Sequence, residues 1–196
     1  MYEHAGQRRI KSVTGRRLPP PIDEILERSR VLDVGCGNGW LRHHCRSYAG
    51  YTISDTEYQY LKSQNIEVYK AKHEIPSDDF DCIVMNHFLE HIPQCQITQE
   101  LNSYKRCFSG DSAQEKYIIA TTPTQFGIGF YGEWSHVRPY DHDSLPSLLE
   151  DHGFAVQDWF YPKIWTWPKI AQRLGRFALF PLRPYIFNEI SVIAKY

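Results

Sequence analysis

The sequence has little surplus of either charge: 22 Lys and Arg residues stand against 23 Asp and Glu residues, a formal net charge of −1. Domains that bind nucleic acid are usually strongly basic, so this balance argues against nucleic acid as a partner. Disorder is also excluded, because 42% of the residues are hydrophobic and 23% are charged, a composition typical of globular proteins. A chain of 196 residues corresponds to about one domain.

Three further features are missing. The five cysteines, an odd number, have no C-x-x-C spacing, which argues against a disulfide framework and against a Cys-rich zinc site. No stretch approaches the ~20 apolar residues that cross a bilayer. Residues 1–21 are basic but contain no apolar core, so we do not expect a secretory signal there. Together these absences predict a cytoplasmic protein.

Short apolar runs alternate with stretches of helical pattern along the chain. The runs predict strands at residues 31–34, 50–55, 66–70, 80–85, 116–121, 154–161 and 189–195. The stretches between them predict helices at residues 22–28, 40–48, 57–64, 97–108 and 144–152. This alternation is typical of βαβ units, so we predict an α/β fold, a doubly wound Rossmann-like sheet of seven mostly parallel strands with helices on both faces. Ligands bind such sheets at the carboxyl ends of the strands.

Residues 33–39, DVGCGNG, follow the first predicted strand and precede a predicted helix, the context of a nucleotide-binding turn. Glycine permits positive φ and lets a ligand lie against the backbone. A dinucleotide fingerprint would need a third glycine where this chain has Trp40, and no Lys-Ser/Thr pair follows, which excludes a P-loop. The alternative is a turn that serves only the geometry between strand and helix.

The segment VLDVGCGNG resembles the first motif of the class I S-adenosylmethionine-dependent methyltransferases, of the type 11/12-like group. The similarity continues with Asp55 at the end of the second strand and with DDFDCIVMNHFLEHI around the fourth. It extends through TTP after the fifth strand and HVRPYDHDSLPSLLEDHGF before the sixth, and it resumes in EISVIAKY. The resemblance covers residues 30–161 and the last strand, and it implies S-adenosylmethionine as cofactor.

The resemblance also implies where that cofactor binds. The glycine loop would approach the methionine part, Asp33 would orient the amino group, and Asp55 would accept hydrogen bonds from the ribose hydroxyls. The candidate cofactor-binding residues are Asp33, Gly35, Cys36, Gly37, Gly39, Asp55, Asn86 and His87. Asp55 has the alternative role of a helix N-cap or turn aspartate. Where the family often has an acid against the adenine, either His73 or Glu74 could substitute, or backbone and apolar contacts could hold the ring.

Residues 127–140, GIGFYGEWSHVRPY, form a long glycine- and aromatic-rich connection after the fifth strand. A loop of this length inside a compact domain is usually functional, and this one can cover the ligand edge of the sheet. An acceptor oxygen benefits from a general base, for which the candidates are His136, Tyr140 and His87. The alternative is that residues 136–140 only anchor the loop.

Glu90 and His91 allow two interpretations. In the first, they cap or bond a loop. In the second, the pattern H-x-x-E-H from residue 87 resembles the E-x-x-E-H arrangement with which some relatives bind a divalent metal, and His136 would be the distant partner. Residues at i, i+3 and i+4 share a helix face, and two histidines with a carboxylate suit a transition metal better than magnesium. Because a histidine replaces the first acid, we predict no metal.

We expect residues 1–21 to form a basic arm and residues 22–196 to form a single domain with a basic, aromatic insertion at residues 162–188. The insertion contains Lys163, Lys169, Arg173, Arg176 and Arg183 and no acid. Residues 169–180 predict a basic amphipathic helix, which favours contact with a membrane surface through residues 163–187. The alternative is a helix packed over the acceptor pocket or in a dimer interface.

We therefore predict an enzyme that transfers a methyl group from S-adenosylmethionine to an oxygen of a small-molecule or lipid-linked acceptor. One alternative is a catalytically inactive methyltransferase-like module for binding or membrane docking. The other is a nicotinamide-dependent oxidoreductase, which would share the fold. The expected location is the cytoplasm, with peripheral contact to a membrane if the insertion binds one.

Overall fold

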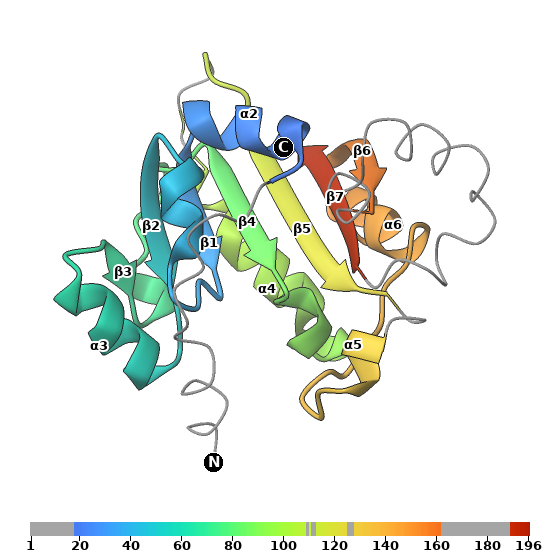
Figure 1. Ribbon diagram of the computed structural model, residues 1–196. Helices are drawn as coiled ribbons and strands as arrows, with labels where there is room; N and C mark the ends of the chain where they lie inside the picture. The colour runs from blue at the N-terminus through green and yellow to red at the C-terminus, as the bar shows by residue number, and fades with distance from the viewer. Residues whose placement is uncertain (1–17, 109, 111–112, 125–127, 162–188) are drawn as a thin grey trace, which may run out of the picture.

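The computed structural model describes residues 18–108, 110, 113–124, 128–161 and 189–196 (Figure 1). Their strands form one seven-stranded sheet in the order β3-β2-β1-β4-β5-β7-β6. The strands are β1 (Arg30–Val34), β2 (Ser47–Tyr51), β3 (Val68–Tyr69), β4 (Cys82–Asn86), β5 (Tyr117–Pro123), β6 (Ala155–Phe160) and β7 (Glu189–Lys195). Only β7 runs antiparallel to its neighbours, β5 and β6. The predicted doubly wound, mostly parallel sheet is confirmed.

Helices cover both faces of this sheet because alternate strand residues point to opposite sides. The described helices are α2 (Pro20–Arg28), α3 (Asp55–Ser63), α4 (Gln94–Lys105), α5 (Ile128–Tyr131) and α6 (Ser144–Asp151). Three short 3₁₀ turns are η1 (Trp40–His44), η2 (Lys72–Glu74) and η3 (Leu89–His91). Leu32 of β1 packs in one core cluster with residues of α4 and α6, whereas Val31 packs in another with α2 and η1. Figure 1 shows α3 beside β3 at one edge of the sheet and α6 beside β6 at the other.

The second strand and its flanking helices differ from the prediction. The predicted helix at residues 40–48 is only the turn η1, and the strand predicted at residues 50–55 is β2, which ends at Tyr51. Helix α3 begins at Asp55 because the Ser54 side chain caps it, accepting a hydrogen bond from the Glu57 backbone N–H. Asp55 therefore does not end a strand; it is the first residue of a helix.

The other boundaries shift by a few residues. Helix α2 begins at Pro20, two residues earlier than predicted, because a proline at the first helical position loses no hydrogen bond. Helix α4 follows Pro93 and ends at Lys105, and the short helix α5 was not predicted. Residues 1–17 of the predicted arm and the insertion at residues 162–188 lie outside the described residues. Among the described helices, none is long and apolar enough to cross a membrane.

The strand order reverses direction between β1 and β4, which pair with each other in parallel. Successive connections lead from β1 to β2 and β3 on one side, and from β4 to β5 on the other. The loops that leave β1 and β4 therefore lead to opposite sides of the sheet, and sheets of this topology bind ligands in the crevice at that carboxyl edge. Gly35 and His87, each the first residue after its strand, lie at this crevice.

Candidate cofactor and acceptor site

The glycine loop, residues 35–39, turns sharply at the end of β1. The N–H groups of Gly35 and Cys36 both donate to the carbonyl of Tyr51 on β2, at 2.9 and 3.1 Å. Gly37 has φ +54°, and a Cβ atom built on it would meet nothing within 4 Å. Gly39 has φ +68°, and its Cβ would lie 2.7 Å from Leu61 Cδ2. The backbone at Gly37 thus faces open space that a ligand can enter, whereas at Gly39 the packed Leu61 side chain leaves no room for a Cβ atom.

Asp33 lies beneath this loop on β1 and is only 3% exposed. The hydroxyl of Tyr48 donates to Asp33 Oδ2 at 3.0 Å. Burial raises the pKa of Asp33 to about 7; the Tyr48 hydrogen bond opposes this rise and the nearby Glu57 carboxylate adds to it. Asp33 is therefore a carboxyl group that titrates near neutral pH, and a cationic neighbour would stabilise its ionised form.

Glu57 is a second acid beside the loop, and the sequence analysis missed it. Its Oε2 accepts a hydrogen bond of 2.6 Å from Thr52 Oγ1, directly after β2. The side chain of Asp55, by contrast, is 85% exposed and forms an ion pair with Lys70 at 2.9 Å. The pattern Ser54-x-x-Glu57, which is typical of a helix start, was the available signal. The structure brings Glu57, rather than Asp55, close to Asp33.

His87 follows β4 and has φ +55°, a conformation that is rare for residues other than glycine. Its N–H donates to the carbonyl of Thr121 at 2.8 Å, which holds this backbone in place. Nδ1 lies 3.2 Å from Glu90 Oε1, Nε2 lies 4.0 Å from Glu189 Oε1, and the side chain is 30% exposed. Asn86, at the end of β4, is also partly exposed. Both residues lie at the carboxyl end of β4, and their contact with the cofactor stays a prediction.

The connection before α6 packs against Glu90. The N–H groups of Val137 and Arg138 donate to the Glu90 carbonyl, at 2.8 and 3.3 Å. His136 has a side chain that is only 6% exposed, and its Nδ1 donates to the carbonyl of Phe130 at 2.8 Å. Tyr140 is buried, which raises the pKa of its hydroxyl. Of the three candidate bases, His87 is thus the most accessible.

The two adenine candidates lie in η2. Both are exposed, but Glu74 Oε2 already accepts hydrogen bonds from the N–H groups of Lys70 and Ala71, at 2.9 and 3.0 Å. These bonds lower the pKa of Glu74. Glu74 therefore caps a turn, and His73 makes no such contact among the described residues.

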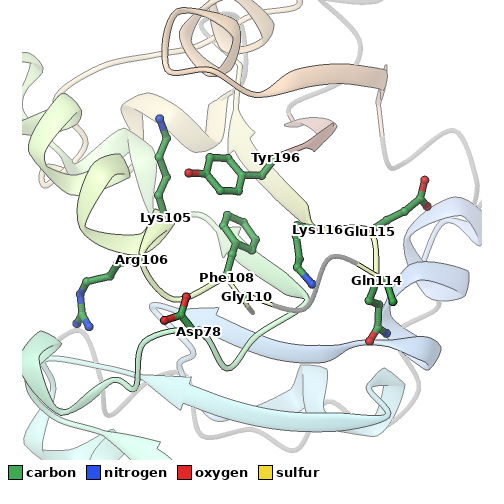
Figure 2. A pocket seen from close by; sticks show the side chains of 10 residues that line it. Asp78, Lys105, Arg106, Phe108, Gly110, Gln114, Glu115, Lys116 and Tyr196 are labelled. Carbon is green, nitrogen blue, oxygen red and sulfur yellow. The ribbon is translucent and has the colours of Figure 1, made fainter.

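A cavity of about 630 Å³ lies elsewhere on the molecule (Figure 2). Asp78 before β4, Lys116 before β5 and Tyr196 after β7 are among its lining residues. These positions are at the amino ends of the parallel strands, whereas the glycine loop and His87 are at the carboxyl ends. The cavity is separate from the candidate site.

Comparison with known proteins agrees with this geometry. Residues 2–158 match the family model described as a methyltransferase domain. The fold is similar to that of a SAM-dependent methyltransferase from Archaeoglobus fulgidus, with 20% identity, 90% of each chain covered and a TM-score of 0.66. A Mesorhizobium loti S-adenosylmethionine-dependent methyltransferase has 14% identity and a TM-score of 0.62, with 90% of this chain and 96% of that chain covered.

A third similar structure is the Burkholderia thailandensis 1,6-didemethyltoxoflavin-N1-methyltransferase with bound 1,6-didemethyltoxoflavin and S-adenosylhomocysteine. It has 14% identity and a TM-score of 0.60, with 89% of this chain and 76% of that chain covered. None of the curated proteins matches the sequence.

The chain belongs to the methyltransferase domain family. It is an enzyme of the class I type that uses S-adenosylmethionine as its cofactor, as the sequence motifs predicted. Family membership also favours methyl transfer over the hydride transfer of a nicotinamide enzyme.

The raised pKa of Asp33 predicts how stability changes with pH. Between pH 3.8, the ordinary pKa of an aspartate, and pH about 7, its pKa in the folded protein, Asp33 is ionised in the unfolded chain but protonated in the folded one. The free energy of unfolding therefore falls as the pH rises through this interval. We expect Asp33→Asn to become more stable relative to the wild type by about 2–3 kcal/mol between pH 5 and pH 8. Urea denaturation of both proteins across this range measures the difference.

The matched control is Asp55→Asn, which removes a carboxylate that is 85% exposed and should follow the wild-type profile. Parallel profiles for Asp33→Asn and the wild type would show that Asp33 is ionised throughout this range.

Proposed function

We propose that this protein methylates an oxygen of a small-molecule acceptor in the crevice between β1 and β4. The observation that carries the proposal is the open backbone at Gly37 above a buried carboxyl group, with His87 at the same edge of the sheet. In the similar Burkholderia protein the bound acceptor is a small molecule. A lipid-linked acceptor and membrane contact are predictions about residues 162–188, outside the described part of the chain.

The residues around the glycine loop fit S-adenosylmethionine. When bound, this cofactor supplies a methyl group activated on a sulfonium. The open backbone at Gly37 leaves room for the methionine part, and the Asp33 carboxyl, ionised, would accept a hydrogen bond from the cationic amino group. We propose Glu57 for the ribose hydroxyls, because its charge acts on Asp33; Asp55 is the alternative that the family resemblance implies.

His87 would serve as the general base. A carboxylate oxygen can only accept, so the contact of 3.2 Å to Glu90 Oε1 requires that His87 Nδ1 donates. In the neutral ring this leaves Nε2 free to take the proton of an acceptor hydroxyl. Glu90, which is fully buried, holds the ring in this tautomer and orientation, as the third group does in a nucleophile–base–carboxylate arrangement.

Gly37→Ala tests whether the glycine loop holds the cofactor. The added Cβ fills open space, so we expect affinity for S-adenosylmethionine to fall by at least ~10-fold, a cost of about 1.4 kcal/mol. Because Gly37 has φ +54°, alanine there also costs about 1–2 kcal/mol of stability, which lowers the melting temperature by a few degrees. Gly39→Ala is the comparison, because its Cβ would clash with Leu61 at 2.7 Å and should chiefly lower the melting temperature. Isothermal titration measures the affinity, and thermal unfolding measures the melting temperature. Wild-type affinity in Gly37→Ala would refute cofactor binding at the glycine loop.

A matched pair of neutral variants tests which acid holds the ribose. Glu57→Gln should weaken S-adenosylmethionine binding by roughly 10-fold, because a hydrogen bond to a charged group contributes about 1.5–3 kcal/mol. Asp55→Asn should leave the affinity within about a factor of two of the wild type, in the range of exposed charges. The opposite result in the same titration would assign the role to Asp55.

Transfer of a labelled methyl group tests the reaction itself. We expect label in a panel of small alcohols, phenols and carboxylic acids and none in matched amines. His87→Gln should lower kcat about 100-fold, within the usual contribution of a general base, without weakening S-adenosylmethionine binding. His43→Gln, at an exposed position in η1, is the control and should keep the wild-type rate.

The same assay separates the alternatives. Label found only in amines would contradict the oxygen acceptor. Tight S-adenosylmethionine binding without transfer to either panel would favour the inactive binding module.

A further inference from the structure

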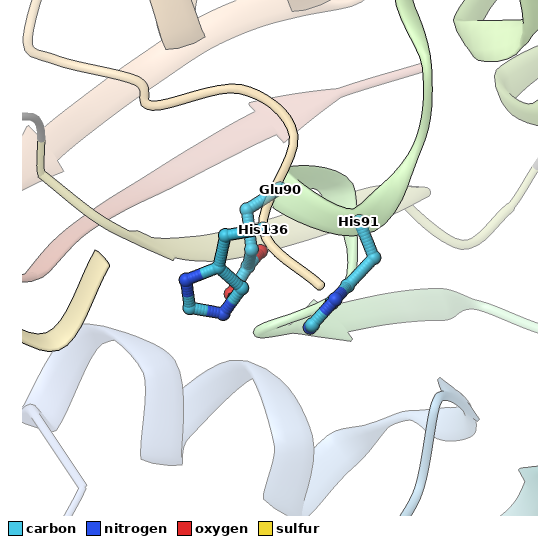
Figure 3. Close-up of side chains that lie close together, drawn as sticks. All are labelled: Glu90, His91 and His136. Atoms are coloured by element: carbon cyan, nitrogen blue, oxygen red, sulfur yellow. The ribbon is translucent and has the colours of Figure 1, made fainter. Parts of the chain in front are cut away.

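Three side chains converge beside the crevice, at the junction of η3 and the connection before α6 (Figure 3). Glu90, His91 and His136 each offer one potential metal-ligand atom, and these atoms all lie within 4.8 Å of one another. These are three of the four residues in the metal interpretation of the sequence; His87, the fourth, is not part of the group. Two residues come from one segment and the third from a loop 45 positions later.

Both imidazoles are held in the same tautomer by backbone carbonyls. His91 Nδ1 lies 3.3 Å from the carbonyl of Ser135, and His136 Nδ1 lies 2.8 Å from that of Phe130. A carbonyl oxygen can only accept, so each Nδ1 carries the hydrogen and each neutral ring keeps its lone pair on Nε2. Histidine ligands of metals are commonly oriented in this way: one ring nitrogen donates to a backbone carbonyl, and the other binds the ion.

The carboxylate completes the group from a buried position. Glu90 is fully buried, and its Oε2 has no hydrogen-bond partner among the described residues. His136 Nε2 lies 3.9 Å from Glu90 Oε1, which is too long for a hydrogen bond. A buried carboxylate oxygen without a partner is costly. A bound cation would satisfy this oxygen and both imidazole lone pairs at once.

Anchoring of the loop accounts for only some atoms of these side chains. The main-chain carbonyl of Glu90 fastens the loop through the N–H groups of Val137 and Arg138, and the Nδ1 atoms of His91 and His136 donate to carbonyls of the same loop. These contacts use neither Glu90 Oε2 nor the Nε2 atom of either ring, so they do not explain why those three atoms converge.

We propose that Glu90, His91 and His136 bind one divalent transition-metal ion, for which zinc is the best fit. Two imidazoles and one carboxylate are a known protein ligand set for zinc that leaves a fourth position open, whereas magnesium and calcium prefer oxygen ligands. Ligand atoms of a tetrahedral zinc site lie about 3.3 Å apart, so small side-chain rotations close the present spacing. The proposal depends on neither the acceptor nor methyl transfer; it shares one residue with the proposed general base, because Glu90 Oε1 also lies 3.2 Å from His87 Nδ1.

Metal titration of the full-length chain tests the site. After chelator treatment and removal of the chelator, we expect the chain to bind one Zn²⁺ or one Co²⁺, measured by isothermal titration and elemental analysis. In ¹⁵N-labelled protein, two histidine side chains should change their Nε2 resonances on zinc addition and keep Nδ1 protonated. This measurement needs no variant, so it stays decisive if a variant fails to fold.

Substitutions then assign the ligands. His91→Ala and His136→Ala should each weaken zinc binding by at least about 100-fold, more than the 10–100-fold loss from outer partners. His73→Ala, at an exposed position, is the control and should keep one zinc per chain. Absence of stoichiometric zinc or cobalt binding would overturn the proposal, and so would unchanged binding in both ligand variants.

Discussion

The parallel pairing of β1 with β4 is the constraint on which the site depends. Val34, the last residue of β1, is in register with Met85 and with Tyr51 of β2. The three chain segments that leave these strands therefore begin at the same level. A Cβ on Gly35 would lie 3.3 Å from Phe88 Cδ2, which shows how closely the two loops pack. The crevice, the glycine loop and His87 all follow from this register.

Three acids near this edge are buried or half-buried. Asp33 lies under the glycine loop, the half-buried Glu57 of α3 acts on Asp33 through its charge, and the buried Glu90 contacts His87. Removing carboxylates from water costs free energy unless charge or hydrogen bonds compensate. For Asp33 the raised pKa is a direct consequence of that cost. Groups with a strongly shifted pKa concentrate where a protein binds or transforms a ligand, and Asp33 lies at the predicted ligand edge.

Much of the fold could be predicted because its determinants are local. Apolar runs such as residues 31–34 and 116–121 alternate with helical patterns, and that alternation alone implies a parallel sheet with a ligand edge. The prediction was wrong around residues 40–55, where a short turn replaces a helix and β2 ends at Tyr51. The predicted strand end at Asp55 is the first residue of α3, although the pattern Ser54-x-x-Glu57 indicates a helix start there.

The sequence by itself determined the class of protein, since the glycine loop and the motifs after the strands retain their order whatever the packing. Only the tertiary structure decided which acid lies close enough to act on Asp33. Asp55 and Glu57 are two residues apart in α3, and about 100° of rotation per residue sends their side chains in nearly opposite directions. The tertiary structure also brought His136 to Glu90 and His91. The sequence left that meeting as one of two interpretations, because it depends on how a distant loop packs.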